Sequence, residues 1–394
     1  MAKFDFSELP LFLQPRLRLF LSVDLVGSTA LKQSSRLPLP NPDSGFAESG
    51  GGPHWLAPIS DFYLEFAEIF ESCWQQHCEK TELPTGDAPS LWKANGDELI
   101  YVKDLNSRLE LYSCLRAWID SIKQYRVDHS KPSRLDIKAT TWTAGFPVFN
   151  TEVVFFSNVS TAKYQYLYDS RLRHFELLQL WYDKPDMRSK LIRDFVGPAI
   201  DMGFRFATLS TPRRLVISLD IAWLLATASL PNKDGQEFAG LKMRYGGQSE
   251  LKGVFSGRPY PYFWLDIMSD DKLTIAEGSL LEEPKSPSSD NVRHFCEAFY
   301  DSNRISLIRP FLVDDDYRYT EIPDRYFDTL QFWKGKLQDE TDKYKKENEP
   351  PPTNVTQTEG GENIDESKVE LLKRKLKKPR SIKARPSKRR TRKR

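Results

Sequence analysis

The chain has 394 residues, of which 39% are hydrophobic and 28% charged. This composition is typical of a water-soluble globular protein and excludes a polytopic membrane protein. At roughly 150 residues per domain, the length allows two or three domains, or one large domain with extensions. The longest apolar-rich stretch, 215–230, contains Asp220 and is too short to span a bilayer. We expect no secretory signal, and the four cysteines form no CxxC pair, which predicts reduced thiols in a cytoplasmic protein.

The net charge of +2 conceals an asymmetry along the chain. Residues 371–394 hold 14 Lys and Arg and no acidic residue. The other 43 of the 57 basic residues stand against all 55 acidic ones, so residues 1–370 carry an excess of twelve negative charges. The basic tail is typical of a contact for nucleic acid or an anionic membrane, or of a solvated tether without a partner. The sequence leaves these alternatives open.

Hydrophobic periodicity predicts the first half of the chain as alternating strands and helices. A strand is expected at 17–25, followed by a helix that begins at Ser28 and Thr29, and 34–53 is a polar loop. A helix at 60–80 is expected to have Ser60 as its N-cap. A hairpin at 91–104 is expected to turn at Asn95-Gly96, with a helix at 107–126 and a strand at 135–149 after it.

This β-α-β-β-α-β order predicts an α+β, ferredoxin-like fold, in which two helices cover one face of an antiparallel sheet. Further along we expect a helical insertion at 161–195, a helix at 196–210, and a strand and helix within 213–230. A last hairpin is expected from 251–255 and 262–267, and helices at 291–301 and 323–346. From 347 onward the composition is typical of disorder.

Two carboxylates stand where this fold brings two elements together. Asp24 closes the first strand and Asp97 lies at the hairpin turn, so we expect them to converge on a shared pair of Mg²⁺ or Mn²⁺ ions. The helix start at Gly27, Ser28 and Thr29 provides free amide groups for a phosphate. Either aspartate alone is more simply a cap or turn residue, and it is their joint position that favours a metal site.

The motifs around these carboxylates resemble a known family. FLSVDLVGST (20–29) followed by KANGD (93–97) is similar to class III nucleotide cyclases, the adenylate and guanylate cyclases. Asp194, Asp201 and Arg205 have the family's spacing of seven and four, and LKGV (251–254) resembles its last hairpin. The resemblance covers about 16–268, and Asp201 departs from the usual Asn. GPAIDMGFR and the insertion at about 150–190 resemble most the pyrimidine cyclases of bacterial Pycsar antiphage systems.

The resemblance implies a role for each of these positions. Asp24, Asp97 and the carbonyl of Leu25 would hold two Mn²⁺ or Mg²⁺ ions. Arg205 would act at the α-phosphate, and Asp201 stands where the family has the Asn that binds the ribose or phosphate region. Lys93 and Asp194 would recognise the base. The family also implies a homodimer in which the metal pair and the Lys/Arg set of one site come from opposite protomers.

The same resemblance implies a domain plan and a reaction. Residues 1–270 would form the catalytic domain, 271–346 a helical extension, and 347–394 a disordered linker and tail. The reaction would convert UTP to 3′,5′-cyclic UMP and pyrophosphate, and a separate effector would respond to the product in antiphage defence.

The sequence leaves several alternatives open. The product could be cyclic CMP, or the chain could be a catalytically silent nucleotide-binding module. A polymerase-type palm has a similar sheet and carboxylate pair, but the acidic balance of residues 1–370 disfavours it. Cys73, His77 and Cys78 lack the second ligand pair that a zinc site needs.

The tail gives a first testable prediction. Deleting residues 347–394 removes a segment with few core-forming residues, so we expect folding and turnover to persist. The melting temperature, the oligomeric state and the rate of pyrophosphate release of the truncated chain test this. A truncated chain that fails to fold or to dimerise would show that the tail docks on the domain.

Overall fold

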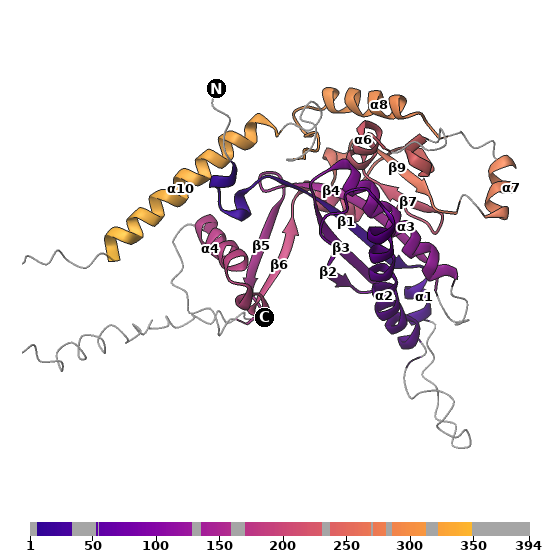
Figure 1. Cartoon of the computed structure of the whole chain (residues 1–394), viewed down its shortest axis with the longest axis horizontal. Helices are drawn as coiled ribbons and strands as arrows, with labels where there is room; N and C mark the ends of the chain where they lie inside the picture. The colour runs from indigo at the N-terminus through magenta and orange to yellow at the C-terminus, as the bar shows by residue number, and fades with distance from the viewer. Residues whose placement is uncertain are drawn as a thin grey trace, which may run out of the picture. The chain divides into compact units, whose positions relative to one another are not determined.

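The computed structural model describes residues 6–33, 53, 55–127, 135–158, 170–230, 237–268, 271–280, 286–312 and 322–348. The chain divides into two units, Met1–Asp339 and Glu340–Arg394, and every strand of the described residues belongs to the first. In chain order the elements are β1 (Arg16–Leu25), α1 (Ser28–Gln33), α2 (Leu56–Lys80), β2 (Ser90–Asn95), β3 (Glu98–Leu105), α3 (Arg108–Val127), β4 (Ile137–Phe146), β5 (Thr151–Phe156), α4 (Ser170–Asp183), β6 (Leu191–Val196), α5 (Pro198–Phe206), β7 (Arg214–Ile217), α6 (Leu219–Thr227), β8 (Met243–Ser249), β9 (Tyr260–Asp266), α7 (Lys272–Leu280), α8 (Ser289–Ser302) and α10 (Asp324–Asn348) (Figure 1).

The fold is α+β, as predicted, and is built on a seven-stranded sheet in the order β2-β3-β1-β4-β7-β9-β8. β1 pairs antiparallel with both β3 and β4, whereas β4 and β7 run parallel. Asp24 is the register partner of Glu98, the first residue of β3. The turn of the β2–β3 hairpin therefore lies beside the end of β1.

Side chains of the central strand β1 point alternately to the two faces of the sheet, as its pleat requires, and pack into two different cores. Leu17, Leu19, Leu21, Val23 and Leu25 belong to the main core, together with Phe66 and Trp118 from α2 and α3. These two helices lie side by side over one face of the sheet (Figure 1). Phe20 faces the other side, where its ring stacks on Trp142 at 5.4 Å between centroids and contacts Phe195 of β6.

Two predicted boundaries in the first half of the chain are wrong by a few residues. Helix α2 begins at Leu56, not after Ser60, because Pro58 fits the first helical turn, where its missing N–H group is not needed. In the hairpin, Asn95 pairs with Glu98, so the two-residue turn is Gly96-Asp97 and not Asn95-Gly96. Gly96 has φ +70°, which suits glycine at the first position of such a turn.

The predicted helical insertion at 161–195 is wrong in part. In the described part of this range, α4 and a short 3-10 helix, Pro185–Lys190, are helical. β6 instead pairs with β5 in a separate two-stranded antiparallel sheet, which we call the arm. Side chains along its two strands alternate between buried and exposed. Glu152, Val154, Leu191 and Phe195 are buried, whereas Phe155, Ile192 and Val196 are exposed. With only six residues each, these strands carry a weak periodic signal beside a longer helical one.

The last hairpin also differs from the prediction. Its strands are β8 and β9, and LKGV lies in the connection between them, where Gly253 and Gly257 both have positive φ. The helix predicted at 196–210 is shorter, at Pro198–Phe206, and α7 was not predicted.

The two C-terminal helices that the sequence predicts are present as α8 and α10. Val292, Cys296 and Tyr300 of α8 are buried in the main core, so this helix completes the packing around the sheet. None of the helices in the described part of the chain combines the length and apolar character needed to cross a bilayer. The loop predicted at 34–53, apart from Pro53, and the segment after 348 lie outside the described residues.

Candidate active site

Asp24 and Asp97 meet at the end of β1, as the sequence predicts. The backbone N–H of Leu25 donates to the carbonyl of Asp97 at 3.2 Å, which fixes the hairpin turn against the strand end. The charge of Asp97 also contributes to the raised pKa of Asp24. Residues 73 positions apart in the sequence thus place two carboxyl groups in one half-buried location.

Two lysines that the sequence analysis did not select face these carboxylates. Lys138 Nζ lies 3.2 Å from Asp24 Oδ2, and Lys32 Nζ lies 3.4 Å from Asp97 Oδ1. Lys138 is the register partner of Asp24 across the β1–β4 pair, and Lys32 stands one helical turn after Ser28 on α1. Lys138 could have been selected only from the register of β1 with β4, and the sequence does not define that register to the residue.

Burial is the main cause of the raised pKa values of the carboxyl groups at this location. It raises the pKa of Asp24, while Lys138 opposes that rise and the charge of Asp97 adds to it. Burial likewise raises the pKa of Glu98, whose carboxylate accepts hydrogen bonds from Ser22 and Asn95. Three carboxyl groups therefore share a place where uncompensated negative charge is costly.

The donor set fits divalent cations in part. Across the described residues, no group of three or more His, Cys, Asp or Glu side chains is arranged to hold a metal ion. Two carboxylates with an adjacent carbonyl still suit Mg²⁺ or Mn²⁺, which complete their shells with water and substrate phosphates. The ammonium groups of Lys138 and Lys32 lie beside Asp24 and Asp97, so positive charge is favoured at this position.

The predicted phosphate site at the start of α1 has less support. Gly27 has φ +79°, and the helix begins at Ser28. The helix has only six residues, which limits its dipole. The hydroxyl of Ser28 donates to the Asp97 carboxylate, whereas Thr29 is exposed. Ser28 therefore orients a carboxylate, and Lys32 is the cation that α1 provides.

Lys93 and Asp194 form an ion pair, with Lys93 Nζ 3.0 Å from Asp194 Oδ1. The two residues come from β2 and β6 and are 101 positions apart. Both side chains keep about a third of their surface exposed, 34% and 39%. A pair held this way presents one donor and one acceptor group to a ligand.

A β-bulge explains how Lys93 reaches this position. Leu91 pairs with Tyr101 and Lys93 with Ile100, so Trp92 is the extra residue. A bulge changes the direction of the side chains around it. As a result the ammonium group of Lys93 lies over the Trp92 ring at 4.0 Å and over Phe204 at 5.4 Å.

Trp92 is packed into an aromatic cluster beside Lys93. Its ring contacts Phe20, Phe195 and Phe204, with centroids 5.3, 5.0 and 6.1 Å away. Trp92 therefore fills space next to the Lys93–Asp194 pair.

Asp201 and Arg205 lie four residues apart on α5 and are both exposed. The helix packs closely on β4 because Gly203 has no side chain: a Cβ there would lie 2.1 Å from the Trp142 ring. Asn150 Oδ1 accepts from the N–H of Ala199 at 3.0 Å and caps the helix start. In the described residues, no hydrogen bond or ion pair connects either residue to Asp24 or Asp97.

A buried network holds the arm, and with it Asp194, against the sheet. Arg18 is 2% exposed and lies 2.6 Å from Asp104 and 2.9 Å from Glu152. Tyr182 of α4 donates to Glu152 at 2.6 Å. Arg18 thereby connects the central strand with β3 and β5, and Tyr182 adds α4. Breaking such a pair leaves a buried charge uncompensated.

No protein-family model matches this chain, and no curated protein matches it. Among solved structures, it is similar to the adenylyl cyclase CyaB from P. aeruginosa, with 12% identity, 64% of this chain and 94% of that chain covered, and a TM-score of 0.39. The guanylyl cyclase Cya2 has 12% identity over 64% of this chain and 92% of its own, with a TM-score of 0.36. A bacterial light-regulated adenylyl cyclase has 11% identity over 67% and 96%, with a TM-score of 0.37.

Proposed function

We propose that this protein is a metal-dependent nucleotide cyclase that acts on a nucleoside triphosphate. The observation that carries the proposal is the convergence of Asp24 and Asp97 at the end of β1. A second residue set, Lys93 and Asp194, is assembled near α5. Carboxylates for cations and a donor–acceptor pair for a base are two of the components that a nucleotide cyclase uses.

The residues divide the chemistry between them. Asp24 and Asp97, with the Leu25 carbonyl, would hold divalent cations, which promote ionisation of the ribose 3′-hydroxyl and neutralise the triphosphate. Lys32 and Lys138 would turn from the carboxylates to the phosphates once cations bind. Arg205 would stabilise the charge that develops on the α-phosphate during attack. The carboxylate of Asp201, one turn earlier on α5, would orient the ribose.

The arm supports a homodimer with shared sites. Phe155, Ile192 and Val196 are 45%, 45% and 42% exposed and lie on the face of the arm that also carries Asp194. Exposed apolar side chains gathered in this way are typical of a protein–protein contact. Asp201 and Arg205 are exposed as well, so a second chain could supply the metal pair that faces them.

We propose a pyrimidine triphosphate, with UTP before CTP, as the substrate. Lys93 and Asp194 can pair with the edge of several bases, so hydrogen bonding alone does not choose among them. Trp92 fills space beside them, and this favours a smaller base. The resemblance to Pycsar cyclases points the same way and implies antiphage signalling through a separate effector.

A competition assay tests the base preference. The protein is incubated with equimolar ATP, GTP, CTP and UTP and Mn²⁺, and the products are identified by mass spectrometry. We expect cyclic UMP as the main product, cyclic CMP next, and the purine products as minor. Mainly cyclic AMP or GMP would contradict the pyrimidine assignment, whereas mainly cyclic CMP would change only the choice within it.

The same assay separates the enzyme from a catalytically silent nucleotide-binding module. A silent module would bind UTP in calorimetry and release no pyrophosphate with either Mn²⁺ or Mg²⁺. The presence of all four side chains at positions 24, 93, 97 and 205 favours the enzyme.

A further inference from the structure

A pocket of about 380 Å³ lies at the opposite end of β1 from Asp24. Leu17 and Gly145 at one end of the β1–β4 pair line it, and they are register partners. Asp24 lies seven positions after Leu17, which is roughly 20 Å along an extended strand. The pocket is therefore a different place from the candidate active site, and its volume suits a small organic molecule.

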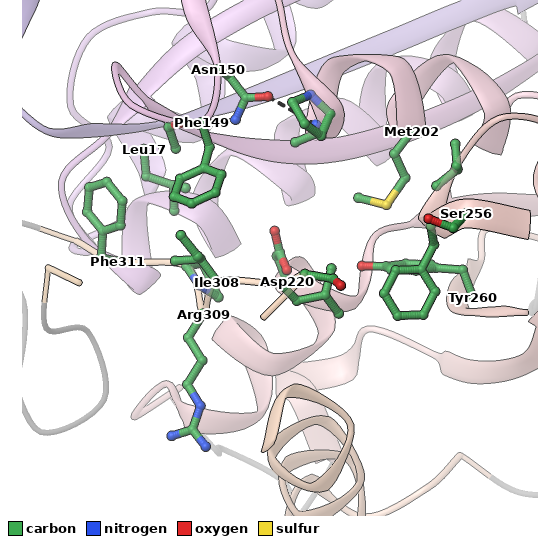
Figure 2. Close-up of a pocket in the computed structure, with 18 of the residues that line it drawn as sticks. Leu17, Phe149, Asn150, Met202, Asp220, Ser256, Tyr260, Ile308, Arg309 and Phe311 are labelled. Atoms are coloured by element: carbon green, nitrogen blue, oxygen red, sulfur yellow. Dashed lines mark hydrogen bonds between the residues drawn. The ribbon is translucent and has the colours of Figure 1, made fainter. Parts of the chain in front are cut away.

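Asp220 is the charged group that faces the pocket (Figure 2). Its carboxylate accepts hydrogen bonds from the hydroxyls of Tyr300 and Thr143, the second at 3.3 Å. Among the described residues no Lys, Arg or His forms an ion pair with it. A partly buried carboxylate with hydroxyl partners alone lacks the counter-charge that such groups normally have.

The two arginines that line the pocket are engaged elsewhere. The Arg258 guanidinium stacks on Phe255 at 3.9 Å and reaches Asn303 at 3.3 Å. Arg309 pairs with Asp301 at 2.8 Å, and its guanidinium points away from the pocket (Figure 2). Positive charge is therefore present at the pocket without reaching Asp220.

Apolar side chains line one part of the pocket, and Asn150, Ser256 and Ser306 add polar groups elsewhere. Figure 2 shows Leu17, Phe149, Met202, Ile308 and Phe311 around the same space as Asp220. Phe311 and Leu17 are buried, at 1% exposure each. A matching ligand would place an apolar body against these side chains and a cationic head against the carboxylate.

We propose that this pocket binds a small molecule that carries a protonated amine on an aromatic or aliphatic body, with Asp220 as the counter-ion. A charge-assisted hydrogen bond in a sheltered site is stronger than a neutral one. The ligand would also contact Pro198, Ala199 and Met202 of α5, the helix that carries Asp201 and Arg205. Binding would therefore act on the candidate active site through that helix.

The binding test uses phenethylamine as the probe, with 2-phenylethanol and 3-phenylpropionate as neutral and anionic analogues of similar size. At pH 8 we expect phenethylamine to raise the melting temperature by about 2–4 °C at ten times its dissociation constant. The alcohol should raise it less and the acid not at all. No stabilisation by the amine, or equal stabilisation by all three, would overturn the proposal.

Two variants locate the effect. Asp220→Asn keeps the size of the side chain and an acceptor for Tyr300, and it should abolish the advantage of the amine over the alcohol. Ala199→Phe fills the pocket from α5 and should abolish binding of both probes. An advantage of the amine over the alcohol that survives in Asp220→Asn would overturn the assignment. If Asp220→Asn does not fold, Ala199→Phe provides the test.

The pH dependence provides a second readout. Burial raises the pKa of Asp220 to about 6, which the hydroxyls of Tyr300 and Thr143 oppose. Tyr260 and Cys296 also face it, and Arg258 and Arg309 stand at the rim. The carboxylate is therefore charged at pH 8 and mostly neutral at pH 5, where the affinity for the amine relative to the alcohol should fall about tenfold. An advantage that is as large at pH 5 as at pH 8 would contradict the ion pair.

The effect on turnover rests on the proposed cyclase function and is measured separately. With UTP and Mn²⁺, phenethylamine should change the rate of pyrophosphate release of the wild type and leave that of Ala199→Phe unchanged. Binding without a change in rate would overturn the link through α5. A protein that binds the amine and has no cyclase activity would contradict the proposed function but not the binding site.

Discussion

Replacing Asp24 or Asp97 by asparagine is expected to reduce pyrophosphate release by about 10³-fold or more. Each substitution removes one negative charge from the pair and changes the side-chain volume little. The loss follows from removing a ligand that the cations need while the phosphates they neutralise remain. The rate is measured with UTP and Mn²⁺, and circular dichroism with a melting curve confirms the fold.

Asp136→Asn is the matched control for this experiment. Asp136 lies next to the same end of β1, where its carbonyl accepts from the N–H of Val26 at 2.8 Å. Its carboxylate pairs with Arg126 at 2.8 Å and does not face Asp24. The same chemical change should therefore leave the rate within a few-fold of wild type. Activity within tenfold of wild type in both Asp24→Asn and Asp97→Asn would contradict the metal assignment.

The sequence predicted the centre of the fold better than its periphery. β1, α2, α3 and β4 have long and regular apolar patterns because they form the main core. The arm has two six-residue strands, and β6 follows a helix closely. Its pairing depends on contacts between distant segments such as the Arg18–Glu152 bridge, which no local pattern reveals.

The candidate site, like the fold, could be predicted from the sequence only in part. Asp24 and Asp97 could be selected because each follows a recognisable local element and the topology places those elements side by side. Lys138 could not, since its position opposite Asp24 depends on strand register. The bulge at Trp92 also escaped prediction, although it brings Lys93 to Asp194. Local patterns define elements, whereas side-chain geometry depends on register and irregularities.

Complementation between two inactive chains is the sharpest test of shared sites. Asp24→Asn and Arg205→Ala should each be inactive, the first in the metal half of a site and the second in the α-phosphate half. In a mixed dimer, one site receives both lesions and the other receives none. Random exchange of equal amounts should therefore restore about a quarter of the wild-type activity, and pure heterodimers about half.

The control mixture combines Asp24→Asn with Asp97→Asn. Both lesions then lie in the same half, so each site of every mixed dimer lacks one carboxylate and no activity should return. Subunit exchange is followed in parallel with differently tagged chains, since only exchanged protein can complement. If exchange is complete and the Asp24→Asn and Arg205→Ala mixture stays inactive, each chain must use its own Arg205. The exposed face of the arm, with Phe155, Ile192 and Val196, would then need another partner.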